Sequence, residues 1–366
     1  MEIGLKNYKI AIVGDCLGLG GAEKVHALLS QYFVSKNIDV HNIIIDDIVT
    51  YPYSGELFIL SDFKSSKNSI FNKIKRFRKL KQYIIEHKFD FIIDFRMKQF
   101  AIRELAIANW IYKVPTCYVI SSGILDFYLP KPQSVAKYIY RNKQISTVSL
   151  GIENQVRKLL DSEIQTIYNP IDFKHIALMS DAFVPIESNY IIAVGRMNDT
   201  VKQFDHLIDA YSKSILPKKN IKLIILGDGK NKIILQKLAL DLGVQNSVIF
   251  KGFCENPYAY MKNAIFMVLS SKNEGFPNVI IESLATGTPV VSYDCFTGPS
   301  EIITHRNNGL LVENQNIEKL TKALNLFVEN SDLYEHCKAN ASTSVQRFSL
   351  EIIGQQWLDL MKINVS

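Results

Sequence analysis

The sequence lacks the features that would place it across a membrane, in a secreted class or around a metal ion. Its longest apolar stretches, such as residues 264–269, fall far short of the ~20 residues that a membrane-spanning helix needs. No apolar signal segment opens the chain, which favours a cytosolic location. The five cysteines are widely spaced without a Cys-x-x-Cys pair, and the seven histidines show no ligand spacing. These absences argue against a disulfide framework and a zinc cluster.

The residues that are present describe a globular protein of more than one domain. The chain has 366 residues, of which 47% are hydrophobic, and its mean hydropathy is +0.04. This length exceeds what one hydrophobic core usually organises. We therefore expect two domains of ordinary size.

Positive charge is concentrated in the first half of the chain. Residues 1–180 hold 24 Lys and Arg against 17 Asp and Glu, whereas residues 181–366 hold 18 against 19. Much of the excess lies in residues 64–81, where apolar residues recur at helical spacing among Lys and Arg. Such a basic amphipathic helix either contacts anionic lipid headgroups or forms an ordinary solvated face, and both interpretations stay open.

Short apolar runs alternate with helical patterns, which indicates parallel sheets. The runs of the first half are residues 9–13, 41–46 and 89–95. The same rhythm restarts at residues 189–195, after residues 181–188, which hold a proline and no periodic pattern. The expected organisation is α/β, with Rossmann-like doubly wound domains at residues 1–182 and 183–345, and a helix in residues 346–366 that packs back on the first domain.

One candidate site follows a predicted strand at residues 274–282, with the sequence EGFPNVIIE. Pro277 suits the first position of a helix, so the N–H groups near Asn278 and Val279 would face an anion such as a diphosphate. Glu274 and Glu282 could each accept hydrogen bonds from ligand hydroxyls. Both carboxylates could equally be placed by the helix dipole alone.

A second candidate is the glycine-rich turn after the first strand, which ends in Gly20 and Gly21. Glycines allow close approach of the backbone to a phosphate. Their spacing does not form a clean G-x-G-x-x-G. A nicotinamide-binding interpretation therefore stays open here, together with the acidic pair Asp46 and Asp47 at the end of the next strand.

Taken together, these motifs resemble glycosyltransferase family 4, the retaining glycosyl transferases group 1 with the GT-B fold, over nearly the whole chain. Glu274 and Glu282 match the family's Glu-x7-Glu motif. The resemblance continues, in family order, in YNPID (168–172), AVGRMNDTVKQFDHLIDAY (193–211), GDG (227–229), GPSEII followed by NNGLLV, and the closing RFS (347–349). It implies two Rossmann-like domains facing a central cleft, the first binding the acceptor and the second a nucleotide sugar.

The resemblance also implies roles for particular residues. In the family, Arg and Lys at the positions of Arg196 and Lys202 hold the donor's diphosphate, Glu274 lies near the sugar's 3-hydroxyl and Glu282 on the ribose. The backbone positions expected around the donor are Gly20, Gly21, Gly252, Phe253, Gly275, Phe276, Asn278 and Val279. Without the resemblance, Arg196 and Lys202 would be interpreted as solvated surface cations.

The expected chemistry needs positive charge rather than a bound metal. Breaking the sugar C1–O bond places negative charge on the departing nucleotide, and fixed cations and helix N–H groups stabilise it without reorganisation. The manganese-binding Asp-x-Asp motif of the other large glycosyltransferase fold does not occur in the sequence. No metal or other cofactor is therefore expected.

One departure concerns the acceptor side. Many family members carry a His near the end of a strand like residues 116–123, where this chain has Ser121, Ser122 and Gly123. This leaves the acceptor-side contact unassigned, with Asp126 as a candidate neighbour.

The sequence thus predicts a retaining transferase that moves a hexose or N-acetylhexosamine from a nucleoside diphosphate sugar, uridine-linked, to a hydroxyl of a growing glycan. Front-face attack, with the leaving phosphate taking the acceptor proton, fits the lack of a carboxylate nucleophile. The acceptor could be lipid-linked at the inner face of the cell membrane, contacted through residues 64–81, and no nucleic-acid partner is expected. Two other classes stay open: a non-catalytic sugar-nucleotide-binding subunit and an NAD(P)-dependent oxidoreductase.

Overall fold

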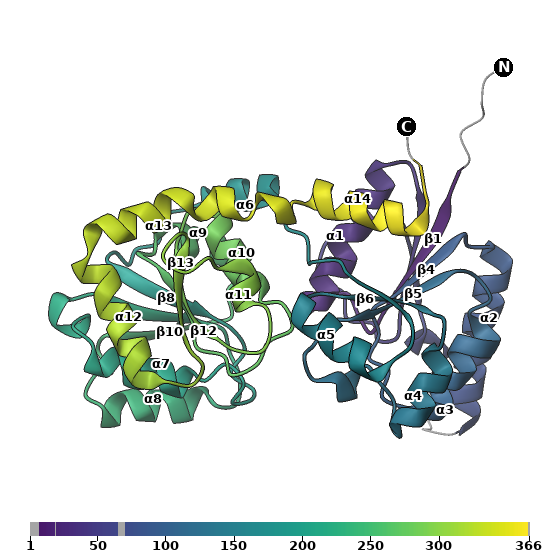
Figure 1. Cartoon of the computed structure of the whole chain (residues 1–366), viewed down its shortest axis with the longest axis horizontal. Coiled ribbons are helices and arrows are strands. Elements are labelled where there is room, and N and C mark those ends of the chain that lie inside the picture. Colours follow the sequence, from purple (N-terminus) through teal and green to yellow (C-terminus); the bar gives the residue numbers. More distant parts are fainter. Residues whose placement is uncertain (1–6, 19, 65–69, 365–366) are drawn as a thin grey trace, which may run out of the picture. The chain divides into compact units, whose positions relative to one another are not determined.

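The computed structural model describes residues 7–18, 20–64 and 70–364, and it divides the chain into two compact units (Figure 1). The first unit holds the chain up to Pro170 and again from Leu350, and the second unit holds Ile171–Ser349. The chain thus passes from the first unit to the second after Pro170. The sequence had predicted this boundary later, at residue 182. The reason is the helix Phe173–Ser180, which packs on helices of the second unit.

The sheet of the first unit has seven parallel strands in the order β3-β2-β1-β4-β5-β6-β7. Its central strand β1 pairs with β2 on one side and β4 on the other, with Ile10 opposite Val40 and Phe91. The strands are β1 (Lys9–Gly14), β2 (Asp39–Ile44), β3 (Glu56–Ile59), β4 (Phe91–Asp94), β5 (Thr116–Ile120), β6 (Gln144–Thr147) and β7 (Glu163–Thr166).

Helices connect these strands and cover the sheet (Figure 1). The predicted basic helix is present, but it starts at Ile70 and continues to His87, and residues 65–69 lie outside the described residues. In the described ranges, no helix is both long and apolar enough to cross a membrane. The helical segments are α1 (Gly21–Ser35), η1 (Ser61–Phe63), α2 (Ile70–His87), α3 (Ala101–Ala106), η2 (Ile107–Ile111), η3 (Leu125–Phe127), α4 (Gln133–Tyr140), α5 (Leu150–Leu159) and α14 (Leu350–Met361).

The last helix, α14, belongs to the first unit, as expected from the sequence. It packs along α1, where Gly354 lies directly against the ring of Tyr32. Trp357 is 2% exposed and stacks at a tilt on Phe95, with ring centroids 6.2 Å apart. The end of the chain therefore completes the core of the unit with which the chain begins.

The sheet of the second unit has six parallel strands in the order β10-β9-β8-β11-β12-β13. They are β8 (Tyr190–Val194), β9 (Lys222–Leu226), β10 (Val248–Gly252), β11 (Met267–Leu269), β12 (Val290–Asp294) and β13 (Gly309–Glu313). The helical segments are α6 (Phe173–Ser180), α7 (Phe204–Lys213), η4 (Pro217–Lys219), α8 (Lys232–Asp241), α9 (Pro257–Asn263), α10 (Asn278–Ala285), α11 (Pro299–Ile302), α12 (Ile317–Glu329), α13 (Ser331–Ser344) and η5 (Gln346–Phe348).

The core of the second unit explains why its strands are almost continuously apolar. Ile191, Ile225 and Val291 from three strands are fully buried together with Leu207 of α7 and Leu324 of α12. Parallel strands covered by helices on both faces have no solvent-facing side, so both sets of side chains must be apolar.

Both sheets reverse their strand order next to their first strand. The reversal lies between β1 and β4 in the first unit and between β8 and β11 in the second. In open α/β sheets, ligands bind outside the carboxyl ends of the strands at this switch point. The loops that follow these four strands are therefore the places to look for function.

Candidate functional site

In the second unit, the loops after β8 and β11 are tied to each other at the switch point. The amide of Lys272 donates to the carbonyl of Val201 at 2.9 Å, and the hydroxyl of Ser270 donates to the carbonyl of Lys202 at 2.8 Å. These bonds hold the backbone of both loops, so the side chains that the loops carry are positioned rather than freely mobile.

At this junction the structure brings together two residues that the sequence analysis had singled out separately. Nζ of Lys202 lies 2.6 Å from Oε1 of Glu274, and the two side chains are 23% and 14% exposed. The stem of Lys202 lies across Gly195, where any added Cβ would come within 3.2 Å of its Cε. The glycine before Arg196 thus leaves room for the lysine to reach the carboxylate.

A third loop, which follows β12, supports the loop that carries Glu274. The amide of Glu274 donates to the carbonyl of Phe296 at 2.9 Å, and the amide of Thr297 donates back to the carbonyl of Glu274 at 3.0 Å. The hydroxyl of Thr297 also donates to the carbonyl of Gly275 at 2.6 Å. Sequence reasoning missed Phe296 and Thr297, which lie in the loop after β12.

Cys295 is a buried, uncharged side chain beside the Lys202–Glu274 ion pair. Its side chain is 2% exposed. Burial raises the pKa of its thiol to about 12, with the Glu274 carboxylate adding to this rise and Lys202 opposing it. Because the thiolate is the reactive form of cysteine, Cys295 is not poised as a nucleophile.

The helix α10 starts at Asn278, one residue after the start predicted from Pro277, which instead takes the N-cap position. The ring of Phe276 is 6% exposed and meets Phe348 edge-on, with ring centroids 5.3 Å apart. This packing anchors the turn from Gly275 to Pro277 that leads into the helix. The N–H groups of the first turn of a helix carry partial positive charge, so this end of α10 is a candidate place for an anion.

The remaining predicted residues of the second unit lie around the same region, on the loops and helix that follow its strands. Arg196 is exposed in the loop after β8, and Glu282 is 5% exposed in the second turn of α10. Gly252 ends β10 and accepts a 2.7 Å hydrogen bond from the amide of Gly227, and the adjoining Phe253 is 77% exposed. Within the described ranges, no group of three or more His, Cys, Asp or Glu side chains could hold a metal ion.

Gly20 and Gly21 belong to the first unit, at the switch point next to β1. Gly20 directly precedes α1, and the carboxylate of Glu23 folds back against it. The helix α1 therefore starts directly after Gly20, with an acidic side chain in its first turn.

The end of β4 carries a buried ionic cluster that sequence reasoning did not single out. Nη2 of Arg96 donates to Asp94 at 2.6 Å and to Glu104 at 3.2 Å, and all three side chains are at most 2% exposed. Nζ of Lys98, which is 1% exposed, donates to three backbone carbonyls, one of them that of Val119 at 3.0 Å. A signal was available, since five charged residues follow each other closely in DFRMKQFAIRE after an apolar strand.

Asp15 extends this polar region to the end of β1. Its Oδ2 accepts a hydrogen bond from the amide of Met97 at 2.8 Å, across the switch point. Burial raises the pKa of the Asp15 carboxyl, although the Met97 amide and the cations Arg96 and Lys98 oppose the rise. Asp126, the candidate acceptor-side residue from the sequence, instead has a 64% exposed side chain and pairs with Lys131 at 2.6 Å.

Comparison with known proteins gives a consistent result. Residues 179–344 match the family described as Glycosyl transferases group 1. Over 360 residues, the chain is 29% identical to N-acetylgalactosamine-N,N'-diacetylbacillosaminyl-diphospho-undecaprenol 4-alpha-N-acetylgalactosaminyltransferase of Campylobacter jejuni, covering 93% of this chain and 95% of that protein. It is 31% identical over 218 residues to the lipopolysaccharide 1,6-galactosyltransferase of Escherichia coli, covering 57% of this chain and 58% of the relative.

Solved structures share the fold over nearly the full length. The apo form of the lipopolysaccharide outer core galactosyltransferase WaaB superposes with a TM-score of 0.71 at 21% identity, covering 97% of this chain and 99% of the other. Anabaena Alr3699/HepE in complex with UDP superposes with a TM-score of 0.76 at 20% identity and the same coverage. Both likenesses support the two-unit Rossmann-like fold.

Proposed function

We propose that this chain, whose residues 179–344 match the glycosyl transferases group 1, is a glycosyltransferase that transfers a hexose or N-acetylhexosamine from a uridine-linked nucleotide sugar to a hydroxyl of a growing glycan. The observation that carries this proposal is the Lys202–Glu274 pair at the switch point of the second unit. It combines a cation for the diphosphate with a carboxylate for the sugar. The oxidoreductase interpretation of the glycine-rich turn is set aside, because the Campylobacter relative, a sugar transferase by its name, matches over 93% of this chain.

The donor's diphosphate would bind between Lys202, Arg196 and the N-terminus of α10. When the sugar C1–O bond breaks, the nucleotide departs with an additional negative charge. Lys202, Arg196 and the N–H groups of the helix start would stabilise that charge. Because these groups supply positive charge themselves, we propose that transfer proceeds without a metal ion.

The sugar and the ribose would each be held by one carboxylate. In the free protein Glu274 is already paired with Lys202, so a bound diphosphate would take over Lys202 and release Glu274 to accept hydrogen bonds from a sugar hydroxyl. Glu282 lies further along the chain, in the second turn of α10, and would accept a hydrogen bond from the ribose. Gly252 and Phe253 would border the nucleobase.

We propose retention of configuration by front-face attack. The acceptor hydroxyl would approach the same side of the sugar from which the diphosphate departs, and a leaving phosphate oxygen would take the hydroxyl proton. Cys295, the buried group next to Glu274, is held as a neutral thiol. It therefore supplies no nucleophile for a covalent intermediate.

The acceptor is proposed to be a lipid-linked glycan, with the first unit as its binding unit. The Campylobacter relative, whose name states a diphospho-undecaprenol-linked acceptor, matches over 93% of this chain. Asp15 is proposed to accept a hydrogen bond from an acceptor hydroxyl, since one of its oxygens is fixed by Met97 and it lies at the switch point. The basic helix α2 would bring the protein to the inner face of the membrane.

The direct test is to incubate the purified chain with a panel of nucleotide sugars and a lipid-linked acceptor, with and without a chelator. We expect UDP release from one donor, unaffected by the chelator. NMR of the product should show that the anomeric configuration of the donor sugar is retained. Glu274→Ala should abolish release, whereas Glu313→Gln, an exposed carboxylate on β13, should not. Inversion of the anomeric centre, or loss of activity with the chelator, would contradict the proposed mechanism.

A further inference from the structure

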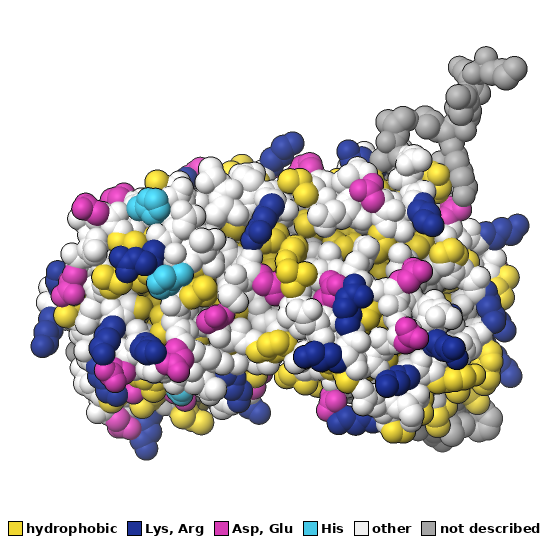
Figure 2. Space-filling model, in the orientation of Figure 1, with side chains coloured by type: hydrophobic (Ala, Val, Ile, Leu, Met, Phe, Trp, Pro, Cys, Tyr) yellow, Lys and Arg dark blue, Asp and Glu magenta, His cyan; other side chains and the backbone are white. Residues whose placement is uncertain are grey.

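The ionic cluster at the end of β4 contains two buried cations. Lys and Arg side chains project from the surface of the molecule at many points (Figure 2), as is usual for charged groups, whereas Arg96 and Lys98 are 2% and 1% exposed. Burying a charge costs free energy unless it is well paired and hydrogen-bonded. Arg96 is paired with two carboxylates, but Lys98 forms no ion pair with a described residue, so its burial calls for another explanation.

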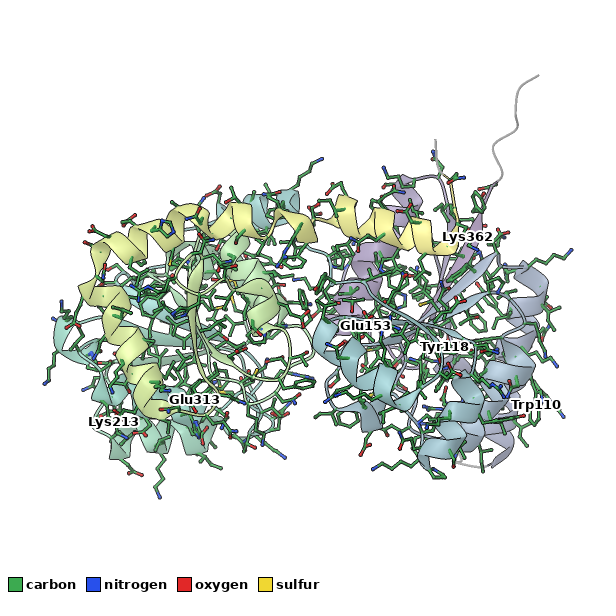
Figure 3. All side chains as sticks on the ribbon, viewed as in Figure 1. Trp110, Tyr118, Glu153, Lys213, Glu313 and Lys362 are labelled. Carbon is green, nitrogen blue, oxygen red and sulfur yellow. The ribbon has the colours of Figure 1, made fainter. Side chains whose placement is uncertain are left out.

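The ammonium of Lys98 fixes the loop after β4 from the inside. Its Nζ donates to the carbonyls of Asp94 at 3.0 Å and Arg96 at 2.6 Å, and to that of Val119 on the neighbouring β5 at 3.0 Å. Tyr118, the residue before Val119, is 2% exposed and lies in the interior of the unit (Figure 3). All three donors of the ammonium are thereby used, and the loop cannot shift relative to β5 without breaking a buried hydrogen bond.

The peptide groups of Met97 lie within this loop and are held on both sides. The N–H of Met97 donates to Oδ2 of Asp15 at 2.8 Å, and its carbonyl accepts from Nη2 of Arg103 at 2.6 Å. The next amide, that of Lys98, donates to the carbonyl of Phe127 at 2.7 Å. The direction of the Met97 N–H, and with it the orientation of the Asp15 carboxylate, therefore follows from the loop that Lys98 holds.

The charges of the cluster also match a carboxylate at the position of Asp15. The cluster has three cations, of which Arg103 is the outermost, against the two carboxylates Asp94 and Glu104. Asp15 lies next to the cluster and supplies the third negative charge. Nearby opposite charges favour each other's ionised form, so the surplus cation favours Asp15 as a carboxylate.

We propose that Lys98 is a positioning residue for the acceptor, because it holds Asp15 as an oriented carboxylate that accepts a hydrogen bond from an acceptor hydroxyl. Oδ2 of Asp15 is engaged by the Met97 amide, whereas Oδ1 accepts no hydrogen bond from a described residue. Oδ1 is therefore the oxygen that remains for the acceptor. The inference rests on the proposed role of Asp15, and it adds a buried lysine on which recognition of the acceptor depends.

The charge of Lys98 predicts how acceptor binding responds to pH. Burial raises the pKa of the Asp15 carboxyl and Asp94 adds to the rise, whereas the Met97 amide, Arg96 and Lys98 oppose it. Acceptor binding should be complete above this pKa and be lost as the pH falls through it, since a protonated Asp15 is the weaker acceptor. The other titratable groups that face Asp15 are Cys16 and Tyr128, whose own pKa values are raised by burial.

The test is the pH profile of kcat/KM for a lipid-linked acceptor at a saturating concentration of the nucleotide sugar. Lys98→Met should raise the acceptor KM about tenfold at neutral pH with little change in kcat, as expected when one hydrogen bond to a charged group is lost from binding. Its acidic limb should move to higher pH, because a cation that favours the Asp15 carboxylate is removed. An acceptor KM that does not change, or a loss of activity without movement of the limb, would overturn the proposal.

Two further variants show whether the loop or the charge is responsible. Arg103→Met removes the contact with the Met97 carbonyl from a side chain that is 29% exposed, so it should raise the acceptor KM severalfold without emptying the core. Lys131→Met removes a cation that is 74% exposed and should change neither KM nor the limb. If Lys98→Met does not fold, Arg103→Met decides, and an unchanged acceptor KM there would overturn the proposal.

Asp15→Asn separates this inference from the proposed function. We expect it to raise the acceptor KM and to abolish the acidic limb, while the affinity for UDP, measured for every variant, stays constant. If Asp15→Asn left the acceptor KM unchanged, the proposed role of Asp15 would be wrong. If Asp15→Asn raised it while Lys98→Met and Arg103→Met did not, that role would stand and positioning by Lys98 would be refuted.

Discussion

Replacing Glu274 with Gln is expected to tighten the binding of UDP while it abolishes sugar transfer. In the free protein Lys202 is engaged by Glu274 at 2.6 Å, so UDP must displace the carboxylate before it gains the lysine. A pair whose side chains are 23% and 14% exposed is comparable to partly exposed ion pairs, which contribute about 0.2–1 kcal/mol. Removing this competition should strengthen UDP binding roughly 1.4- to 5-fold.

Titration calorimetry of UDP into the wild type and the Glu274→Gln variant measures this change. The matched control is Glu313→Gln, which removes an exposed carboxylate that pairs with Lys319 on the same unit, and UDP affinity should not change there. Lys202→Met should instead weaken UDP binding about tenfold or more, because a hydrogen bond between charged groups is lost. If Glu274→Gln weakened UDP binding while its thermal unfolding stayed normal, the competition between carboxylate and diphosphate would be refuted.

Three further outcomes follow from the described contacts. Gly227→Ala should lower the free energy of unfolding by about 2–3 kcal/mol in urea titrations, because φ is +136° and a Cβ would overlap the carbonyl of a neighbouring residue. Gly243→Ala, where φ is +70° and the space around the Cβ is open, should lower it by about 1 kcal/mol. Equal losses in the two variants would contradict the close approach of the backbone at Gly227. Burial lowers the pKa of His26 to about 4. The contribution of His26 to the free energy of unfolding should therefore be complete above pH 6.5 and fall by up to about 3 kcal/mol as the pH drops towards 4, because only the unfolded chain binds the proton in this range. A midpoint of unfolding that does not change with pH in this window would contradict the burial of a neutral His26. Asp15→Asn should reduce transfer to the acceptor while UDP affinity stays constant, and the exposed Asp126→Asn should alter neither; a loss of UDP binding in Asp15→Asn would place that residue elsewhere in the reaction.

The fold was largely predictable because buried parallel strands leave a strong pattern. The apolar runs that begin at Lys9 and Asn189 proved to be the central strands β1 and β8. Edge strands such as Glu56–Ile59 and Glu163–Thr166 were missed, since each has only four residues and is partly exposed. The break before Ile171 was also missed, because which unit a helix packs on is not encoded in its own periodicity.

The sequence singled out members of the candidate site one by one, but it could not show how they come together. The resemblance singled out Lys202 and Glu274 individually, yet their contact spans 72 positions and depends on β8 and β11 being neighbours in the sheet. The support from Thr297 depends in the same way on β12 lying next to β11. Asp15 was missed because the group that fixes it, the amide of Met97, is 82 positions away.

The central claim is that the second unit binds a nucleoside diphosphate sugar through Lys202 and Glu274. The most direct measurement is the thermal stabilisation of the chain by a panel of nucleotide sugars, for the wild type and for Lys202→Met. We expect one uridine-linked sugar to raise the unfolding temperature of the wild type, with the shift largely lost in the variant. If no nucleotide sugar stabilises the wild type, or if the variant is stabilised to the same extent, the assigned donor site is wrong.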